Sequence, residues 1–283
     1  MLQRRLGREL IPAPEFFGAT AQGKRRVYAV LPAILGVHAA VPMLVIAMNN
    51  RLFTPNALLA GASAYVAALA EILIALAFLY GALTRLAAVV LALLWAAGVF
   101  LVGAQTMLDD ILYLGIAAFF WLCGRGPYAL DRYLFPRYEP EAKLVRNAIP
   151  ALRMSVGLSF VIVAFTEKFA NIPYGLAFLH QYPVNFSAAA GIPLSDETFL
   201  LCAGSVELLV GLWLLFGIWQ REIILIGWLP FNLSLTYFHA TEFIGHLPIY
   251  GVMALLLIWN PSPQSLADWT AALSRVRHSS EKL

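Results

Sequence analysis

The sequence predicts an all-α integral membrane protein in which eight transmembrane helices form two parallel four-helix repeats, with both termini in the cytoplasm. Three observations support this prediction. Hydrophobic residues make up 61% of the 283 residues and charged residues only 12%, against roughly 45–50% and 25% in soluble chains. The apolar residues are gathered in eight long runs, and the chain matches itself at a constant offset. The mean hydropathy of +0.76 also excludes a soluble domain or a disordered chain.

The eight apolar runs predict the spans. A helix needs about 20 apolar residues to cross a bilayer, because lipid cannot pair with free backbone polar groups. Membrane barrels would show alternating segments of about ten residues, and these runs do not alternate. The last run is short, and its helix can begin inside the preceding loop. The expected spans are residues 27–48, 58–84, 87–107, 111–129, 148–168, 199–219, 223–243 and 245–259.

The positions of Lys and Arg predict the orientation. Residues 1–26 hold six of them, the connection between the fourth and fifth spans holds five, and the C-terminal tail holds three. The loops on the other side hold only Arg51 and Lys168. Positive loops stay in the cytoplasm, so both termini are expected there. The net charge of +3 comes from these clusters. We therefore interpret the positive charge as a signal that sets the orientation in the membrane, and we exclude a nucleic-acid partner.

An internal repeat predicts the domain organisation. A shift of 136 residues places Glu71 on Glu207, Arg85 on Arg221 and Gly115 on Gly251. Four helices per unit keep both units in the same orientation, which predicts a parallel repeat. The expected divisions are a cytoplasmic or interfacial segment at 1–26, the first unit at 27–131, a cytoplasmic linker at 132–147, the second unit at 148–266 and an amphipathic cytoplasmic tail at 267–283.

Two segments have alternative interpretations. The second unit carries an insertion at 170–198, rich in aromatic residues and prolines, which is either an interfacial or re-entrant segment or a cap over the outer face of the bundle. In the tail, Leu266, Trp269 and Leu273 share one helical stripe. That stripe lies either on the membrane or against the protein's own cytoplasmic face.

Two glutamates occur inside apolar helices. Placing a carboxylate in the bilayer costs at least about 2.5–3.5 kcal/mol, so Glu71 and Glu207 are expected to face the bundle and find partners. Each lies fourteen residues before its arginine, or about 21 Å along a helix, which places both in the outer half of the membrane. Their role is either structural or connected with protons or substrate.

The second unit has further polar groups at this depth. Lys168 is expected either to extend to the interface or to pair with Glu207. His239, Glu242 and His246 would share one face of a continuous helix, and a transition metal there is an alternative to a hydrogen-bonded cluster. Gly245 and Pro248, however, predict that the helix breaks before His246. The first unit has Gly103 and Thr106 at the equivalent positions, so we expect no polar face there.

The motif Arg153-x3-Gly157, the run Glu167-Lys168-Phe169 and the pattern Gly204-x2-Glu207-x3-Gly211-x5-Gly217-x3-Arg221 resemble the DoxX family of bacterial membrane proteins. The resemblance covers about residues 150–266 and, more weakly, 28–131. It implies a cytoplasmic (inner) membrane location. The family includes membrane subunits of thiosulfate:quinone oxidoreductases, so it also implies quinone as the cofactor. The roles that it implies fall on Lys168, Glu207, Arg221, Glu71 and Arg85.

These observations leave three functions open: a quinone-linked oxidoreductase or its membrane subunit, a transporter or channel for a small ion or solute, and a non-catalytic scaffold for a redox complex. No haem or flavin motif is visible. The expected partners are membrane lipid and a redox protein, with a homo-oligomer as an open alternative. We predict that the second unit carries the activity, with catalytic residues Lys168, Glu207, His239 and Glu242 and substrate-binding residues Glu71, Arg153, His180, Tyr182 and His246.

Overall fold

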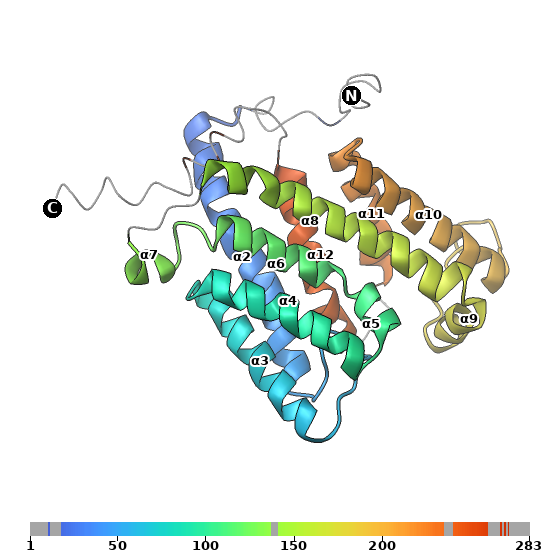
Figure 1. Cartoon of the computed structure of the whole chain (residues 1–283). Coiled ribbons are helices and arrows are strands. Elements are labelled where there is room, and N and C mark those ends of the chain that lie inside the picture. The colour runs from blue at the N-terminus through green and yellow to red at the C-terminus, as the bar shows by residue number, and fades with distance from the viewer. Residues whose placement is uncertain are drawn as a thin grey trace.

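The computed structural model describes residue 11, residues 18–136, 141–234 and 240–259, and positions 267, 269 and 271. Throughout these residues the chain is helical, with no β-strand (Figure 1). The helices are α2 (Ala21–Ala47), α3 (Gly61–Tyr80), α4 (Thr84–Leu101), α5 (Ala104–Asp109), α6 (Leu112–Cys123), α7 (Asp131–Leu134), α8 (Ala142–Val163), the π-helix η2 (Ala164–Phe169), α9 (Ile172–Gln181), α10 (Asp196–Phe216), α11 (Gln220–Ser234) and α12 (Ala240–Ile258).

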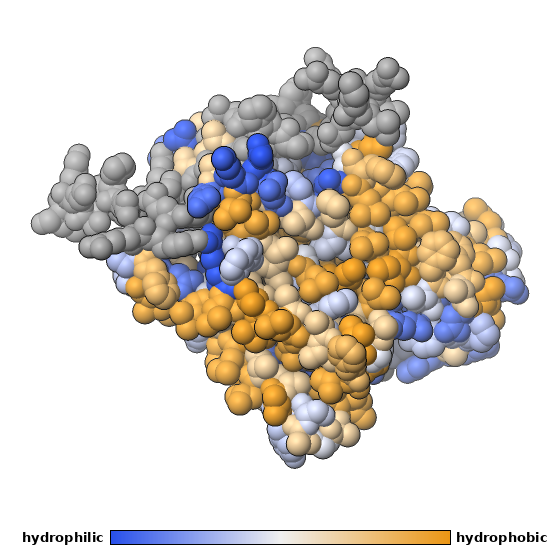
Figure 2. All heavy atoms as spheres, viewed as in Figure 1, coloured by the Kyte–Doolittle hydropathy of each residue, from blue (hydrophilic) through white to orange (hydrophobic). Residues whose placement is uncertain are grey.

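The length and composition of the helices indicate a multi-pass membrane protein. Among the described residues, five helices are long and apolar enough to cross a bilayer: α2, α3, α4, α8 together with η2, and α10. Residues Leu112–Cys123 and Phe243–Ile258 form shorter apolar helices. Figure 2 shows hydrophobic side chains over much of the surface around α3, α4 and α10, with hydrophilic ones near the start of α8 and beside α9. Outward-facing apolar residues include Leu69, Leu73, Leu93, Phe100, Leu209 and Phe216.

The helices pack in a closed sequence of neighbours. From α2 onward, each long helix contacts the next one along the chain, and α12 returns to pack against α2. Small residues allow close approach at these contacts. A Cβ on Gly157 of α8 would lie 2.9 Å from the carbonyl oxygen of Gly211 in α10, and a Cβ on Gly251 of α12 would lie 2.6 Å from the His38 side chain in α2. The helices therefore pack closely enough to hold the side chains between them in defined positions.

Two predicted spans end earlier than the hydropathy suggests. The expected span 87–107 is divided, because α4 ends at Leu101 and Gly103, with φ of 99°, starts the separate helix α5. The expected span 111–129 ends at Cys123, where Gly124 has a φ of 68°. Hydropathy does not register these turns, because glycine enters the left-handed region without cost.

The predicted break before His246 is wrong. Helix α12 runs from Ala240 to Ile258 with Pro248 inside it, so Glu242 and His246 lie on this last helix and not at the end of the preceding one. Proline removes one backbone donor and crowds the preceding turn, yet neighbouring helices often compensate within membrane bundles. Helix α2 likewise contains Pro32 and Pro42.

The flanking segments are only partly described. Helix α2 already begins at Ala21, and α8 begins at Ala142 inside the predicted linker. In the tail, Trp269 is 1% exposed and its ring packs against Tyr28, Phe119 and Trp259. At this position the tail therefore packs against the protein. The remaining residues of the 267–283 tail, apart from 267 and 271, and residues 1–10 and 12–17 lie outside the described part.

Candidate functional site

An ion pair joins the end of the fifth predicted span to helix α10. Lys168 Nζ lies 2.8 Å from Glu207 Oε2 and 3.5 Å from Glu167 Oε2. Lys168 belongs to η2, the π-helical continuation of α8, and such turns occur frequently at functional sites. Gly204, one turn before Glu207, leaves the space for the lysine, since a Cβ there would lie 3.1 Å from Lys168 Cβ. The structure therefore brings together two of the predicted catalytic residues.

The 170–198 insertion covers this region through α9. A Cβ on Gly175 would lie 2.8 Å from the Glu167 carbonyl oxygen and 2.6 Å from Leu200, so α9 packs closely on both η2 and α10. Of the predicted binding residues in the insertion, His180 is exposed on α9, and Tyr182 packs its ring against Phe178. The insertion thus packs on η2 and α10, the two elements that carry Lys168 and Glu207.

Glu71 occupies a second polar site in the first half of the chain. Its side chain is 0% exposed, and its Oε1 accepts a hydrogen bond of 2.9 Å from the backbone amide of Phe53. The hydroxyl of Tyr113 donates to the Phe53 carbonyl over 3.2 Å, and the two rings pack 4.7 Å apart. Glu71 Oε2 is buried without a hydrogen-bond partner in the described part of the chain. The loop after α2 therefore provides a hydrogen-bond partner for Glu71, as Lys168 does for Glu207 in the second half of the chain.

Asp109 and Asp110 connect the two polar sites. Thr166 of η2 donates to Asp109 Oδ1 over 2.7 Å, and the charge of Asp109 interacts with Glu167 and Lys168. Asp110 interacts electrostatically with Glu71 and Tyr113, and its buried Oδ2 has no hydrogen-bond partner within the described residues. Burial, reinforced by the charges of Asp109 and Glu167, raises the pKa of Asp110 well above its ordinary value. We call this series the carboxyl row: Glu71, Asp110, Asp109, Glu167 and Glu207, with Lys168 beside the last two.

The carboxyl row includes Asp109 and Asp110, two residues that the sequence analysis did not assign to a site. Two adjacent carboxylates between apolar helices were a signal in the sequence that could have placed Asp109 and Asp110 in a site. Their contacts with η2 join residues 57 positions apart, and no local spacing reveals such a contact.

The predicted arginines donate hydrogen bonds to carbonyl oxygens at helix ends. Arg153 donates to the carbonyl oxygens of Leu214 and Leu215 at the C-terminal end of α10, the second bond being 2.8 Å long. It lies fifteen residues before Lys168, or about 22 Å along a helix, so the structure does not bring it to the ion pair. Arg85 and Arg221 donate to the carbonyl oxygens of Leu122 and Leu257, at the ends of α6 and α12. These guanidinium groups satisfy helix ends.

The predicted cluster on the last helix is only partly described. His239 and the side chain of Glu242 lie outside the described part, while His246 is half-buried on α12. The neighbouring Gly245 approaches Pro55, in the loop that also holds Phe53. Within the described residues, no group of three His, Cys, Asp or Glu side chains could hold a metal ion. Cys123 and Cys202 are both free thiols.

Comparisons with protein-family models, with curated proteins and with solved structures find no match to this chain.

Proposed function

We propose that the chain is a DoxX-like membrane protein that acts as a quinone-linked oxidoreductase or as the membrane subunit of one. The observation that supports this most directly is the Lys168–Glu207 pair, which is held inside apolar helices and continues into the carboxyl row. Ionisable groups in such surroundings are costly and usually have a function. The resemblance adds thiosulfate as the electron donor and the bacterial inner membrane as the location, with a partner protein delivering the electrons.

The chemistry of the site fits a quinone. Reduction of a quinone to the quinol consumes two electrons and two protons. The ammonium group of Lys168 can donate a hydrogen bond to an oxygen that gains negative charge. The Glu207 carboxylate, after taking up a proton, can pass it on to the quinone, and two such transfers supply the two protons of the quinol. Glu167, Asp109, Asp110 and Glu71 then form a route along which that proton is replaced. Glu71 Oε2 and Asp110 Oδ2 are both buried without a hydrogen-bond partner among the described residues, so holding a proton would remove an uncompensated charge at each of them.

A second function is favoured by the extent of the carboxyl row. Its members come from both halves of the chain, with Glu71 on α3 and Glu207 on α10, and the bond from Thr166 to Asp109 joins α5 to η2. Proton-coupled transporters place such carboxylates at the interface of two repeats. A transporter for a small ion or solute is therefore our alternative proposal.

We further propose that the chain folds as two parallel units with eight spans. The backbone turns after α3 and α10 support this. Gly81 and Gly217 have φ of 68° and 66°, and two residues later Leu83 and Trp219 have φ of 52° and 44°. Both pairs are separated by 136 residues. Leucine and tryptophan rarely adopt positive φ. The same unusual backbone conformation at two positions separated by 136 residues is therefore hard to explain by a shared apolar composition alone.

The arginines at these helix ends give further support. Arg125 donates to the Phe78 and Leu79 carbonyls over 2.6 and 3.1 Å, and Arg153 donates to the equivalent carbonyls of Leu214 and Leu215. A Cβ on Gly36 of α2 would lie 2.6 Å from Arg125 Nε. The first unit thus leaves space on its first helix for an arginine from the loop after α6, whereas the second unit carries the arginine on the first helix itself.

The proposed topology has both termini and the 132–147 linker in the cytoplasm, because these segments hold most Lys and Arg residues. We expect single cysteines at Glu141 and Asp196, in a chain whose Cys123 and Cys202 are replaced by serine, to be labelled from opposite sides of the membrane. An impermeant maleimide applied to intact cells should label only the cysteine at position 196. Labelling of that position only after lysis would overturn the topology.

The proposed activity is testable in proteoliposomes. We expect the chain, reconstituted with its electron-donating partner, to reduce a short-chain ubiquinone or menaquinone analogue when thiosulfate is added, as measured by quinone absorbance. A proton gradient that drives solute uptake without any change in quinone absorbance would instead favour the transporter. Activity that is unchanged when both Lys168 and Glu207 are replaced would contradict both proposals.

A further inference from the structure

A hydrogen bond between η2 and α5 links the Lys168–Glu207 pair to the first half of the chain. Thr166 Oγ1 lies 2.7 Å from Asp109 Oδ1 and 3.1 Å from the carbonyl oxygen of Ile162, one turn earlier on α8. A hydroxyl carries one proton, so it donates to one acceptor at a time. The bond to Asp109 is the shorter one, and a carboxylate is the stronger acceptor. The Thr166 side chain therefore joins η2 to α5 and does not serve its own helix alone.

A second bond fixes the same end of α5. Ser159 of α8, which is 7% exposed, donates to the backbone carbonyl oxygen of Asp109 over 3.2 Å. Ser159 and Thr166 are seven residues apart, or about two turns of helix, so both face α5. The end of α5 thus cannot slide along α8 and η2 without breaking one of these bonds.

The position of η2 decides where Lys168 lies. The π-helical turn is only six residues long, Ala164–Phe169, and Lys168 follows Thr166 by two residues within it. A Cβ on Gly204 of α10 would lie 3.1 Å from Lys168 Cβ, and Lys168 Nζ lies 2.8 Å from Glu207 Oε2. A small shift of the turn along α10 would therefore change both distances.

We propose that Thr166 is a positioning residue, whose bond to Asp109 holds the π-helical turn where Lys168 reaches Glu207. The first half of the chain thereby sets the geometry of the pair in the second half. The effect on turnover rests on the proposed function, whereas the effect on geometry does not. The charge of Asp109 also acts on Lys168 directly, but that action needs no hydroxyl at position 166. Thr166→Val and Thr166→Ser separate the two effects.

Cross-linking measures the position of the turn without any activity. In a chain whose Cys123 and Cys202 are replaced by serine, the variant Lys168→Cys/Gly204→Cys brings two Cβ atoms to 3.1 Å, close to the roughly 3.8 Å of a disulfide. Oxidation in membranes should cross-link this chain rapidly. Adding Thr166→Val should slow the reaction about fivefold, which corresponds to the loss of one typical hydrogen bond. Thr166→Ser, which keeps the hydroxyl, should leave the rate unchanged.

Thr106→Val is the matched control for the substitution. The Thr106 hydroxyl donates to the Val102 carbonyl oxygen over 3.3 Å, within the segment that leads into α5, and makes no bond to η2. Its loss should leave cross-linking at the rate of the parent. An equal rate in Thr166→Val and Thr106→Val would overturn the proposal.

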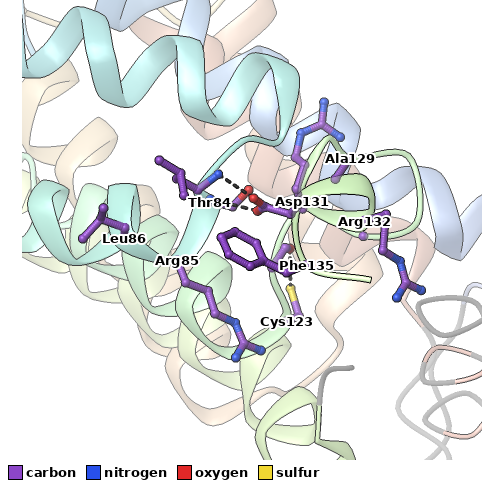
Figure 3. Close-up of a pocket in the computed structure, with 12 residues that line it drawn as sticks. Thr84, Arg85, Leu86, Cys123, Ala129, Asp131, Arg132 and Phe135 are labelled. Carbon is purple, nitrogen blue, oxygen red and sulfur yellow. Dashed lines mark hydrogen bonds between the residues drawn. The ribbon is translucent and has the colours of Figure 1, made fainter. Parts of the chain in front are cut away.

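Asp131→Ala is the control for a general loss of stability. Asp131 lies beside the cavity at the end of the bundle that carries α7, and its carboxylate accepts hydrogen bonds from the backbone amides of Leu83 and Thr84 (Figure 3). Its replacement should lower the melting temperature and leave cross-linking unchanged. Cross-linking slowed as much as in Thr166→Val would mean that the rate reports loosening of the whole bundle, and the proposal would fail.

Turnover provides the second measurement, in chains that keep Lys168 and Gly204. Thr166→Val should lower kcat for quinone reduction by up to about 100-fold per folded molecule with little change in KM, because a misplacement of about 1 Å can cost that much. Thr166→Ser should restore most of it. Full kcat in Thr166→Val would refute the catalytic effect of the positioning. If the parent itself reduces no quinone, the proposed function fails, and cross-linking alone decides whether Thr166 positions Lys168.

Discussion

Replacing Glu207 with glutamine is expected to lower quinone-dependent turnover by about 10²–10⁴-fold, the usual contribution of a positioned proton donor. Glutamine keeps the size of the side chain, and its carbonyl oxygen can still accept a hydrogen bond from Lys168, which lies 2.8 Å from Glu207 in the parent. Lys168 also keeps its contact with Glu167. The fold should therefore persist while the proton is lost, and the comparison of turnover per folded molecule with melting temperature separates the two effects.

Two variants make this comparison sharp. Glu167→Gln removes the other carboxylate beside Lys168, but one whose side chain is more exposed, and should reduce turnover by less than about tenfold. Glu71→Gln keeps an acceptor for the Phe53 amide, so turnover should fall modestly. If Glu71→Gln loses activity at unchanged stability while Glu207→Gln stays active, the reactive site lies in the first half of the chain.

The sequence predicted the parts of this fold that depend on local composition. Long apolar runs located the ends of α2, α3, α8 with η2, and α10 to within six residues, because bilayer thickness and backbone pairing impose helix length directly. The proximity of Lys168 and Glu207 was one of two predicted alternatives, because both residues were expected at a similar depth. In the structure Gly204, one turn from Glu207, permits the approach of the lysine. The repeat stays a prediction, and the left-handed glycines at Gly81 and Gly217 agree with it.

The parts that sequence could not predict depend on contacts between distant segments. The bond from Thr166 to Asp109 brings α5 against η2, and the placement of Arg125 depends on the space at Gly36. Neither contact follows from a helical periodicity or from a fixed spacing in the sequence. The continuation of α12 through Pro248 has the same origin, since neighbouring helices override the local tendency of proline to end a helix.

Replacing Lys168 with methionine is expected to be strongly destabilising. The change keeps an aliphatic stem that can pack beside Gly204, but leaves the Glu207 carboxylate without a cation in apolar surroundings. Breaking a buried pair by removing one partner costs about 3–5 kcal/mol. Because the Glu207 side chain is 27% exposed, we expect a smaller loss of about 2–3 kcal/mol in the free energy of unfolding. Denaturation of the purified protein in detergent measures it.

The double variant Lys168→Met/Glu207→Gln identifies the cause of this loss. With the carboxylate neutralised, no uncompensated charge remains, so the double variant should recover most of the stability that Lys168→Met loses. A double variant as unstable as Lys168→Met would mean that the lysine stabilises the bundle through packing or through Glu167, 3.5 Å away, and not through Glu207. We expect the double variant to recover stability but not turnover. Its neutral side chains remove the uncompensated charge, whereas the proton donor is still missing.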